Sequence, residues 1–139
     1  MIFIDTGAFV ARYVERDQYN AEAMACWAEI EKTAIPCLTS SHVLSEALTL
    51  LARRTTHSLA VGRARLIYAS NEIQVIRSTA DDEAMALKYF ERHANERVSF
   101  TDCISFALMK RRGIEQAFTF DADFTSAGFQ VIPGPRLTA

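Results

Sequence analysis

The stretch Ile2-Phe3-Ile4-Asp5-Thr6-Gly7 opens the chain and decides how the rest of it can fold. Its three consecutive apolar residues are typical of a short strand that is buried on both faces. Burying both faces requires helices above and below the sheet, as in a parallel α/β fold. Asp5 then lies at the carboxyl end of the strand, where ligands bind in open α/β sheets. The groups that converge on Asp5 therefore define the first candidate site.

Short strands alternate with helices along the rest of the chain. Further strands are expected at residues 35–39, 72–76, 117–120 and 129–132. Helices are expected at residues 8–15, 19–32, 41–54, 58–68, 79–93 and 101–112, with a turn or a single helical turn at 121–126. About five strands in this alternation predict a three-layer α/β/α domain around a central parallel sheet. Right-handed crossovers would place the strand-to-helix junctions on one edge of that sheet.

Length and composition are those of one globular domain, residues 1–139. The formal net charge of −2 excludes a bulk attraction to polyanions, so nucleic acid would have to be held by local patches or a metal. No apolar run approaches the roughly 20 residues that span a bilayer, and an acid as early as Asp5 leaves no room for a signal-peptide core. We therefore expect a cytoplasmic protein without membrane partners. The cysteines Cys26, Cys37 and Cys103 have no metal-ligand spacing and should be reduced.

Four acids are placed where they could reach the same sheet edge: Asp5, Glu46, Asp102 and Asp121. Two carboxylates about 4 Å apart repel by roughly 4 kcal/mol at an effective dielectric constant of 20. Such a cluster either holds a proton or binds a divalent cation. Ligands that are all oxygen select hard ions, so Mg²⁺ or Mn²⁺ is expected. A metal held in this way can activate water and neutralise a phosphodiester.

Each acid also has an explanation that involves no metal. Asp5 could cap the helix that follows it. Asp102 could complete the capping box that opens its own helix. Glu46 could lie on a solvated helix face, and Asp121 and Asp123 could be turn residues. The case for a site therefore depends on the four acids in combination.

The acids stand in four segments that closely resemble the four motifs of the PIN-domain ribonucleases and, within that family, the toxins of the VapC type. The segments are Ile2-Phe3-Ile4-Asp5-Thr6-Gly7-Ala8-Phe9-Val10, Ser41-His42-Val43-Leu44-Ser45-Glu46-Ala47, Ser99-Phe100-Thr101-Asp102-Cys103 and Thr119-Phe120-Asp121-Ala122-Asp123-Phe124. The resemblance spans essentially the whole chain. It implies a PIN-like fold and a site in which Asp5, Glu46 and Asp102 are the core Mg²⁺ ligands, with Mn²⁺ as a substitute.

The resemblance also implies roles for the residues around these ligands. Asp121 is the expected fourth acid, and Asp123 could share or take that role. The hydroxyls of Thr6, Thr101 and Thr119 correspond to polar positions that orient ligands or water. The implied reaction is the endonucleolytic hydrolysis of RNA by a metal-activated water, in the toxin of a toxin–antitoxin pair.

RNA binding needs cations, and several basic side chains are candidates for phosphate contacts. They are Arg12, Arg53, Arg54, Arg63, Arg65, Lys110 and Arg111, the last two in a run that ends with Arg112. That run could instead complete a helix C-terminus. Arg12 could also pair with the acidic cluster or meet the cognate antitoxin. The segments 19–32 and 58–68 carry apolar residues in excess, so a homodimer contact or an antitoxin groove is expected there.

The main alternative is a non-catalytic PIN-like module that binds RNA or protein. An intact set of four acids argues against it. A phospho-receiver of similar topology would need an acid pair after the first strand and a lysine after the last one. Asp5 stands alone, and no lysine follows residues 129–132.

Overall fold

The computed structural model describes residues 1–134 and contains one sheet of five parallel strands. The strands are β1 (Ile2–Ile4), β2 (Cys37–Ser40), β3 (Ile73–Ile76), β4 (Gln116–Thr119) and β5 (Gln130–Pro133). They are ordered β3-β2-β1-β4-β5, with β1 in the centre. Residues 135–139, the end of the predicted single domain, lie outside the described residues.

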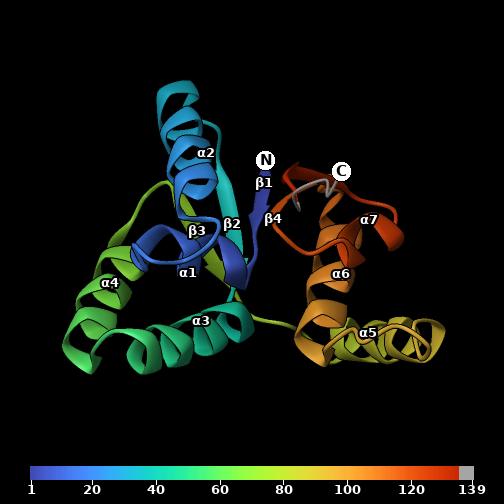
Figure 1. Cartoon of the computed structure of the whole chain (residues 1–139). Coiled ribbons are helices and arrows are strands. Elements are labelled where there is room, and N and C mark those ends of the chain that lie inside the picture. Colours follow the sequence, from blue (N-terminus) through green and yellow to red (C-terminus); the bar gives the residue numbers. More distant parts are fainter. Residues whose placement is uncertain (135–139) are drawn as a thin grey trace.

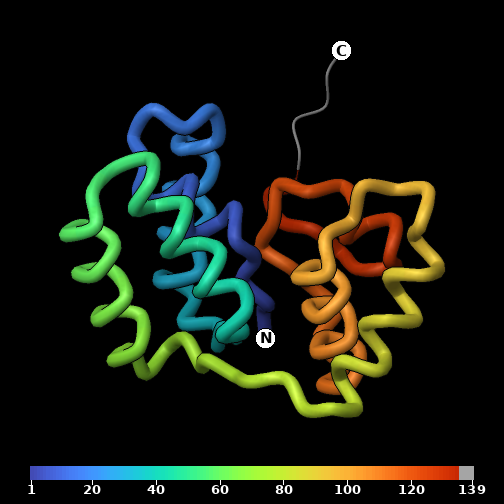
Figure 2. Tube along the Cα trace, turned by 90° about the horizontal axis from the view of Figure 1, so that it is seen from below, coloured from blue at the N-terminus to red at the C-terminus, as the bar shows by residue number. Residues whose placement is uncertain are grey.

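Seven helices flank this sheet in the described part of the chain. They are α1 (Thr6–Tyr13), α2 (Asn20–Thr33), α3 (Ser41–Arg54), α4 (His57–Ala69), α5 (Ala80–Arg92), α6 (Phe100–Arg112) and α7 (Asp123–Ser126). In Figure 1, α1, α2 and α4 lie on one side of the sheet and α5, α6 and α7 on the other. Figure 2 shows the same two groups from below, joined by the segment that leads from β3 to α5. The predicted three-layer α/β/α fold is confirmed, and the predicted element boundaries differ from these by about two residues.

The central strand β1 is buried on both faces, as its apolar sequence predicts. Phe3 and Ile4 have no exposed surface. Trp27 of α2 packs against Phe118 of β4, with ring centroids 5.1 Å apart, and its indole N–H donates to the carbonyl of Ala8 at 3.0 Å. These contacts hold α1 and α2 against the sheet and fix the start of α1 directly after β1.

The cysteines have the state that the sequence predicts. All three cysteines are free, and Cys37 and Cys103 are buried. Within residues 1–134, every helix is too short or too polar to cross a membrane.

The sheet has one edge formed by the carboxyl ends of its parallel strands and an opposite edge formed by their amino ends. The carboxyl ends of β1 and β4 lie at one edge, where α1 and α6 begin. Helix α6 has 13 residues, about 20 Å of length at 1.5 Å per residue. Its first turn and its last turn are therefore at opposite edges of the sheet.

Candidate active site

A pocket of about 630 Å³ opens at the carboxyl ends of β1 and β4. Its lining contains the four acids expected to converge. The lining residues are Asp5, Thr6, Gly7, Val10, Asp17, Tyr19, Glu46, Leu50, Arg54, Ser99, Asp102, Phe120, Asp121 and Ala122. Segments from five parts of the sequence thus meet at the edge that the fold leaves open for a ligand.

Asp5 lies at the bottom of this acid pocket and is 6% exposed. Its Oδ2 accepts a 2.7 Å hydrogen bond from the Thr119 hydroxyl, whereas its Oδ1 is buried without a hydrogen-bond partner among the described residues. Burial raises the pKa of Asp5 to about 6, and the charges of Asp121 and Glu46 act in the same direction. Asp5 occupies the N-cap position of α1 but makes no side-chain cap hydrogen bond, so the helix-cap explanation is wrong. Its carboxylate is directed to the pocket instead.

Asp102, Asp121 and Asp123 form a tight group, of which Asp102 and Asp121 line the pocket. Each contributes a carboxylate oxygen, and the three oxygens lie within 4.8 Å of one another. Burial, followed by the charges of Asp5 and Asp121, raises the pKa of Asp102 to about 8. The pKa of Asp123 is also raised, by burial and by Asp121. The crowding of negative charge that the sequence predicts is therefore present.

Asp121 and Asp102 line the pocket and also have the turn and capping roles that the sequence allows. Asp121 Oδ1 accepts from the backbone N–H of Asp123 at 2.9 Å, as in an Asx turn. Asp102 forms a capping box with Ser99, but its Oδ2 accepts from the Ser99 N–H only at 3.4 Å. That distance is longer than an ordinary N–H···O bond, so the cap uses little of the bonding capacity of the Asp102 carboxylate.

Glu46 reaches the same pocket from α3. It is an exposed residue, yet it lines the pocket, and the Thr6 hydroxyl donates to its Oε2 at 3.4 Å. Arg53, its neighbour on the predicted solvated face, does not line the pocket. The surface of α3 that carries Glu46 therefore faces the other acids.

The three threonines predicted to support the acids differ in position. Thr119 links two of them, because its hydroxyl donates to Asp5 and accepts from the backbone N–H of Asp121 at 3.0 Å. Thr6 contacts Glu46 as described. Thr101 is half-buried in the first turn of α6, and within residues 1–134 its hydroxyl makes no hydrogen bond to the acids. Among the described residues, no hydrogen bond therefore supports the predicted role of Thr101 in orienting the acids.

The acid pocket suits a divalent cation. Its ligand atoms are carboxylate oxygens, the set that hard divalent ions prefer. A buried carboxylate oxygen without a partner, such as Asp5 Oδ1, is costly unless something binds it. A cation of charge +2 would satisfy that oxygen and remove the repulsion that raises the neighbouring pKa values.

Most of the predicted phosphate-binding cations lie away from this pocket. Among the described residues, Arg54 is the one Lys or Arg in its lining. Lys110 and Arg111 are at the far end of α6, about 20 Å from the acids on helix length alone. Arg111 makes two hydrogen bonds to the buried Asp82, at 2.6 and 2.9 Å. Helix α6 thus carries these two candidates for phosphate contacts to the edge of the sheet opposite the acids.

The remaining basic candidates lie on other surfaces. Arg12 pairs with Glu31 at 2.9 Å and stands over the Trp27 ring, 4.6 Å from its centroid, so its predicted pairing with the acidic cluster is wrong. Arg63 stands over the Tyr13 ring. Arg12 and Arg63 both line another pocket, whose lining contains none of the four acids. Arg53 and Arg65 are exposed and do not line the acid pocket.

Comparisons with known proteins agree with this geometry. Residues 2–130 match the family described as PIN domain. The 23S rRNA-specific endonuclease VapC20 of Mycobacterium tuberculosis is 40% identical over 129 residues, which cover 93% of this chain and 95% of that protein. The crystal structure of M. tuberculosis VapC20, a sarcin-ricin loop cleaving toxin, superposes with a TM-score of 0.84 over 93% of this chain and 96% of that one.

More distant structures share the fold alone. VapBC2 from Rickettsia felis, bound to a DNA fragment from its promoter, has a TM-score of 0.65 at 12% identity and covers 94% of this chain and 97% of that one. FitAcB from Neisseria gonorrhoeae has a TM-score of 0.61 at 19% identity, with coverage of 94% and 96%.

Proposed function

Since this chain belongs to the PIN-domain family, we propose that it is a metal-dependent endoribonuclease and the toxin of a toxin–antitoxin pair. The observation that carries the proposal is the convergence of Asp5, Glu46, Asp102 and Asp121 on one pocket. At 40% identity to a 23S rRNA-specific endonuclease, we propose 23S rRNA as the substrate, with the sarcin-ricin loop as the cleaved element. A cytoplasmic location follows from a ribosomal substrate.

We propose that Asp5, Glu46, Asp102 and Asp121 hold Mg²⁺, with Mn²⁺ as a substitute and Asp123 contributing directly or through water. When bound, the ion supplies an activated water and stabilises the charge on the phosphodiester. Thr119 fixes the direction of the Asp5 carboxylate through its 2.7 Å hydrogen bond. Thr6 does the same, over a longer contact, for Glu46. These hydroxyls keep the ligand oxygens in place before the substrate arrives.

Among the described residues, no cysteine lines this pocket. Cys103 follows Asp102 in sequence, but its side chain has no exposed surface. Burial raises the pKa of the Cys103 thiol to about 11, so the thiolate is scarce near neutral pH. Hydrolysis by water is therefore the reaction that the residues support.

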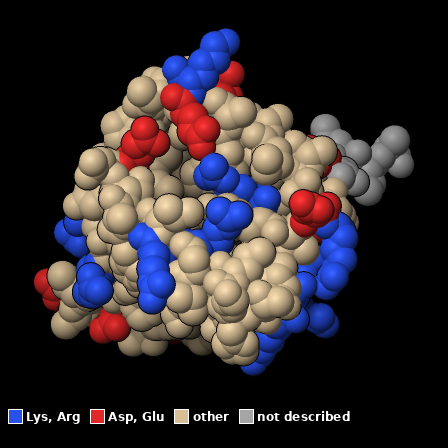
Figure 3. Space-filling model, turned by 90° about the vertical axis from the view of Figure 1, so that its left-hand side faces the viewer, with Lys and Arg blue, Asp and Glu red and all other residues tan. Residues whose placement is uncertain are grey.

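We propose the surface between α2 and α4 as the site of the cognate antitoxin. A pocket of about 370 Å³ lies there, lined by Arg12, Trp27 and Arg63 among others. Large apolar side chains are exposed on the same two helices: Met24, Val61, Leu66 and Tyr68. Figure 3 shows basic side chains over the middle of this side of the molecule, with acidic side chains at its top and near its margins. Exposed apolar surface with a basic border suits an amphipathic segment that carries acids.

A homodimer remains a second proposal about assembly. The exposed apolar residues on α5, Met85, Leu87 and Phe90, offer a further face for it. Sedimentation of the purified protein as a monomer at micromolar concentration would contradict the homodimer.

The experiment that tests the nuclease incubates the purified protein with 23S rRNA in Mg²⁺, in Mn²⁺ and in EDTA. The variant Asp102→Asn removes one proposed ligand, and Asp81→Asn is a matched control on the exposed surface of α5. We expect site-specific cleavage by wild type and Asp81→Asn with either ion, and none by Asp102→Asn or in EDTA. Cleavage that persists in EDTA or in Asp102→Asn would refute the mechanism. Binding of RNA without cleavage in every metal would favour the non-catalytic module.

A further inference from the structure

The acid pocket has a second end that the metal ligands do not use. This end is lined by Asp17, Tyr19, Arg54 and Phe120. Asp17 and Tyr19 come from the segment between α1 and α2, Arg54 is the last residue of α3, and Phe120 directly precedes Asp121. Two aromatic rings and a cation thus stand within the cavity that holds the acids.

The aromatic part of this end is a stacked pair. The rings of Tyr19 and Phe120 are nearly parallel, at 9°, with centroids 4.4 Å apart. Both residues are half-buried and both line the pocket. Aromatic rings in a nucleic-acid groove provide stacking surface for bases, whatever their sequence. A base placed next to the phosphate at the acids would meet this wall.

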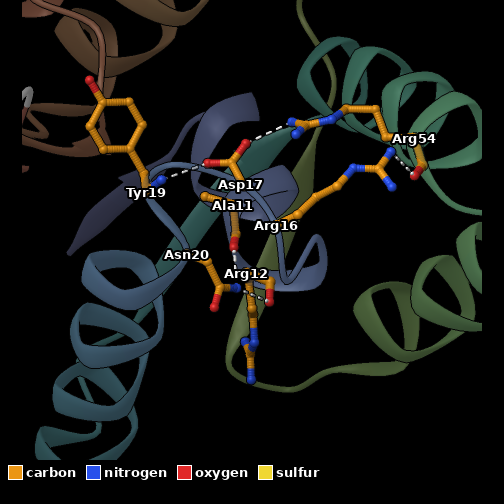
Figure 4. Close-up of polar contacts among 7 residues, drawn as sticks. All are labelled: Ala11, Arg12, Arg16, Asp17, Tyr19, Asn20 and Arg54. Carbon is orange, nitrogen blue, oxygen red and sulfur yellow. Dashed lines mark hydrogen bonds and ion pairs between the residues drawn. The ribbon is translucent and has the colours of Figure 1, made fainter.

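Asp17 holds both the aromatic pair and Arg54 in position. Its Oδ1 accepts from the backbone N–H of Tyr19 at 2.9 Å, and its Oδ2 accepts from Arg54 Nη1 at 2.6 Å. Arg16 donates to the carbonyl oxygen of Arg54 at 2.9 Å and closes the end of α3 from the other side. Figure 4 shows the Arg54 side chain reaching toward Asp17 and the Arg16 side chain reaching toward the backbone carbonyl of Arg54, while the Arg12 side chain points away from them. The segment after α1 is thereby tied to the end of α3.

Arg54 keeps donors available to the pocket. Its side chain is 36% exposed, whereas that of Asp17 is 13% exposed. Within residues 1–134, a single hydrogen bond uses the Arg54 guanidinium, which has five N–H donors. The other donors can meet an anion. RNA entering a pocket of four acids is repelled except where the metal or Arg54 compensates, so this cation is placed where a substrate phosphate most needs one.

We propose that this end of the pocket is a nucleotide subsite for the RNA strand beside the cleaved bond. Arg54 contacts a phosphate, a base packs against Tyr19 and Phe120, and Asp17 is the positioning residue that holds both. The inference rests on the proposed function, since it assigns a role to the substrate of the same pocket. Its occupant is single-stranded RNA, because unpaired bases can be splayed onto an aromatic wall.

The test is equilibrium binding of a fluorescently labelled single-stranded RNA, measured in EDTA at several salt concentrations. Binding without metal separates this subsite from the ligands and from turnover. Each phosphate contact to a single strand contributes about 0.7 to the slope of log affinity against log salt. We expect Arg54→Gln to reduce the slope by about that amount and Arg54→Lys to restore it. Arg112→Gln, at the far end of α6, is the matched control and should leave the slope unchanged.

Tyr19 is tested in the same assay. Tyr19→Leu should weaken binding about 5- to 140-fold without changing the salt slope, since stacking carries no counterion release. Tyr19→Phe keeps the ring and should bind as wild type does. Thermal unfolding of each variant identifies those that have lost the fold, and Arg54→Lys and Tyr19→Phe keep the test decisive if the larger changes unfold the protein.

The positioning role of Asp17 has its own readout. Asp17→Asn keeps an oxygen that can accept from the Tyr19 N–H and loses only the charge that pairs with Arg54. It should therefore weaken RNA binding when Arg54 is present and have no effect in the Arg54→Gln background. Equal effects in both backgrounds would overturn this role.

Failure of the subsite and failure of the nuclease are distinguishable. If wild type cleaves RNA but Arg54→Gln and Tyr19→Leu keep wild-type affinity and slope, the subsite is refuted and the nuclease stands. If these variants lose only the binding of the antitoxin, the surface serves a protein and the inference is again refuted. If they lose RNA binding while wild type cleaves nothing, the subsite stands and the proposed reaction fails.

Discussion

Removing the charge of Asp102 should stabilise the metal-free protein near pH 8, the opposite of what most substitutions at half-buried polar sites do. Burial and neighbouring acids raise the pKa of Asp5 from 3.8 to about 6 and that of Asp102 from 3.8 to about 8. The folded protein therefore holds protons that the unfolded chain has released. Stability must fall as the pH rises from about 4, through pH 6 for Asp5 and on to pH 8 for Asp102.

The magnitude follows from the Asp5 shift, because that residue is 6% exposed. A change of about two pKa units corresponds to about 3 kcal/mol of unfolding free energy. For a chain of this size, that amount lowers the unfolding midpoint by roughly 10 °C between pH 4 and pH 7. Asp102 adds to the fall between pH 6 and pH 8. The variant Asp102→Asn should have a flatter profile and a higher midpoint than wild type at pH 8.

The assay is thermal unfolding in EDTA at a series of pH values from 4.5 to 8.5, for wild type, Asp102→Asn and the surface control Asp81→Asn. Added Mg²⁺ or Mn²⁺ should recover the lost stability of wild type at pH 8 and do much less at pH 5, where Asp5 and Asp102 are mostly protonated. Parallel profiles for wild type and Asp102→Asn, or equal metal effects at both pH values, would refute the reasoning that the acids repel one another across the pocket.

Three further predictions concern other parts of the structure. Thr119→Val removes the hydrogen bond to Asp5 and should weaken Mn²⁺ binding about 10- to 100-fold in calorimetric titration; unchanged affinity would show that Thr119 orients nothing. Asp82→Ala removes the acid of the capping box that opens α5 and the partner of Arg111, so chemical denaturation should show a fall in unfolding free energy of at least about 1 kcal/mol, with RNA cleavage retained. The pKa of Asp82 is lowered chiefly by Arg111, so that loss should shrink as the pH falls below 4. Leu66→Glu, at a position 60% exposed on α4, should abolish capture of the cognate antitoxin in a pull-down while cleavage persists, and full capture would move the antitoxin elsewhere.

The fold could be predicted from the sequence because the patterns that indicate its strands and helices are local. Three apolar residues before Asp5 mark the buried central strand, and Ser99 marks the start of α6 through a capping box that the structure contains. Helix periodicity and turn residues placed the remaining elements to within about two residues. The acids were individually ambiguous, and it was the resemblance of their four segments to the PIN-domain motifs that made their convergence predictable.

The outer parts of the site were not predictable from local pattern. Asp17 reads as a turn residue, and nothing near it in sequence points to Arg54, 37 positions away. The distance between Arg111 and the acids was predictable, since a helix that starts at the acid edge must end about 20 Å from it. The pairing of Arg12 with Glu31 was not predictable from the sequence, because the two residues meet only through the packing of α2 on α1.

The central claim is that the converging acids hold one divalent-ion site on which RNA cleavage depends. The most direct test is the anomalous scattering of Mn²⁺ in crystals of wild type and of Asp102→Asn, grown with the ion. We expect an Mn²⁺ peak in the acid pocket, bonded to carboxylates that include Asp5 and Asp102, and its loss or strong reduction in the variant. An Mn²⁺ peak elsewhere, with the acid pocket free of metal in a protein that still cleaves RNA, would contradict this claim.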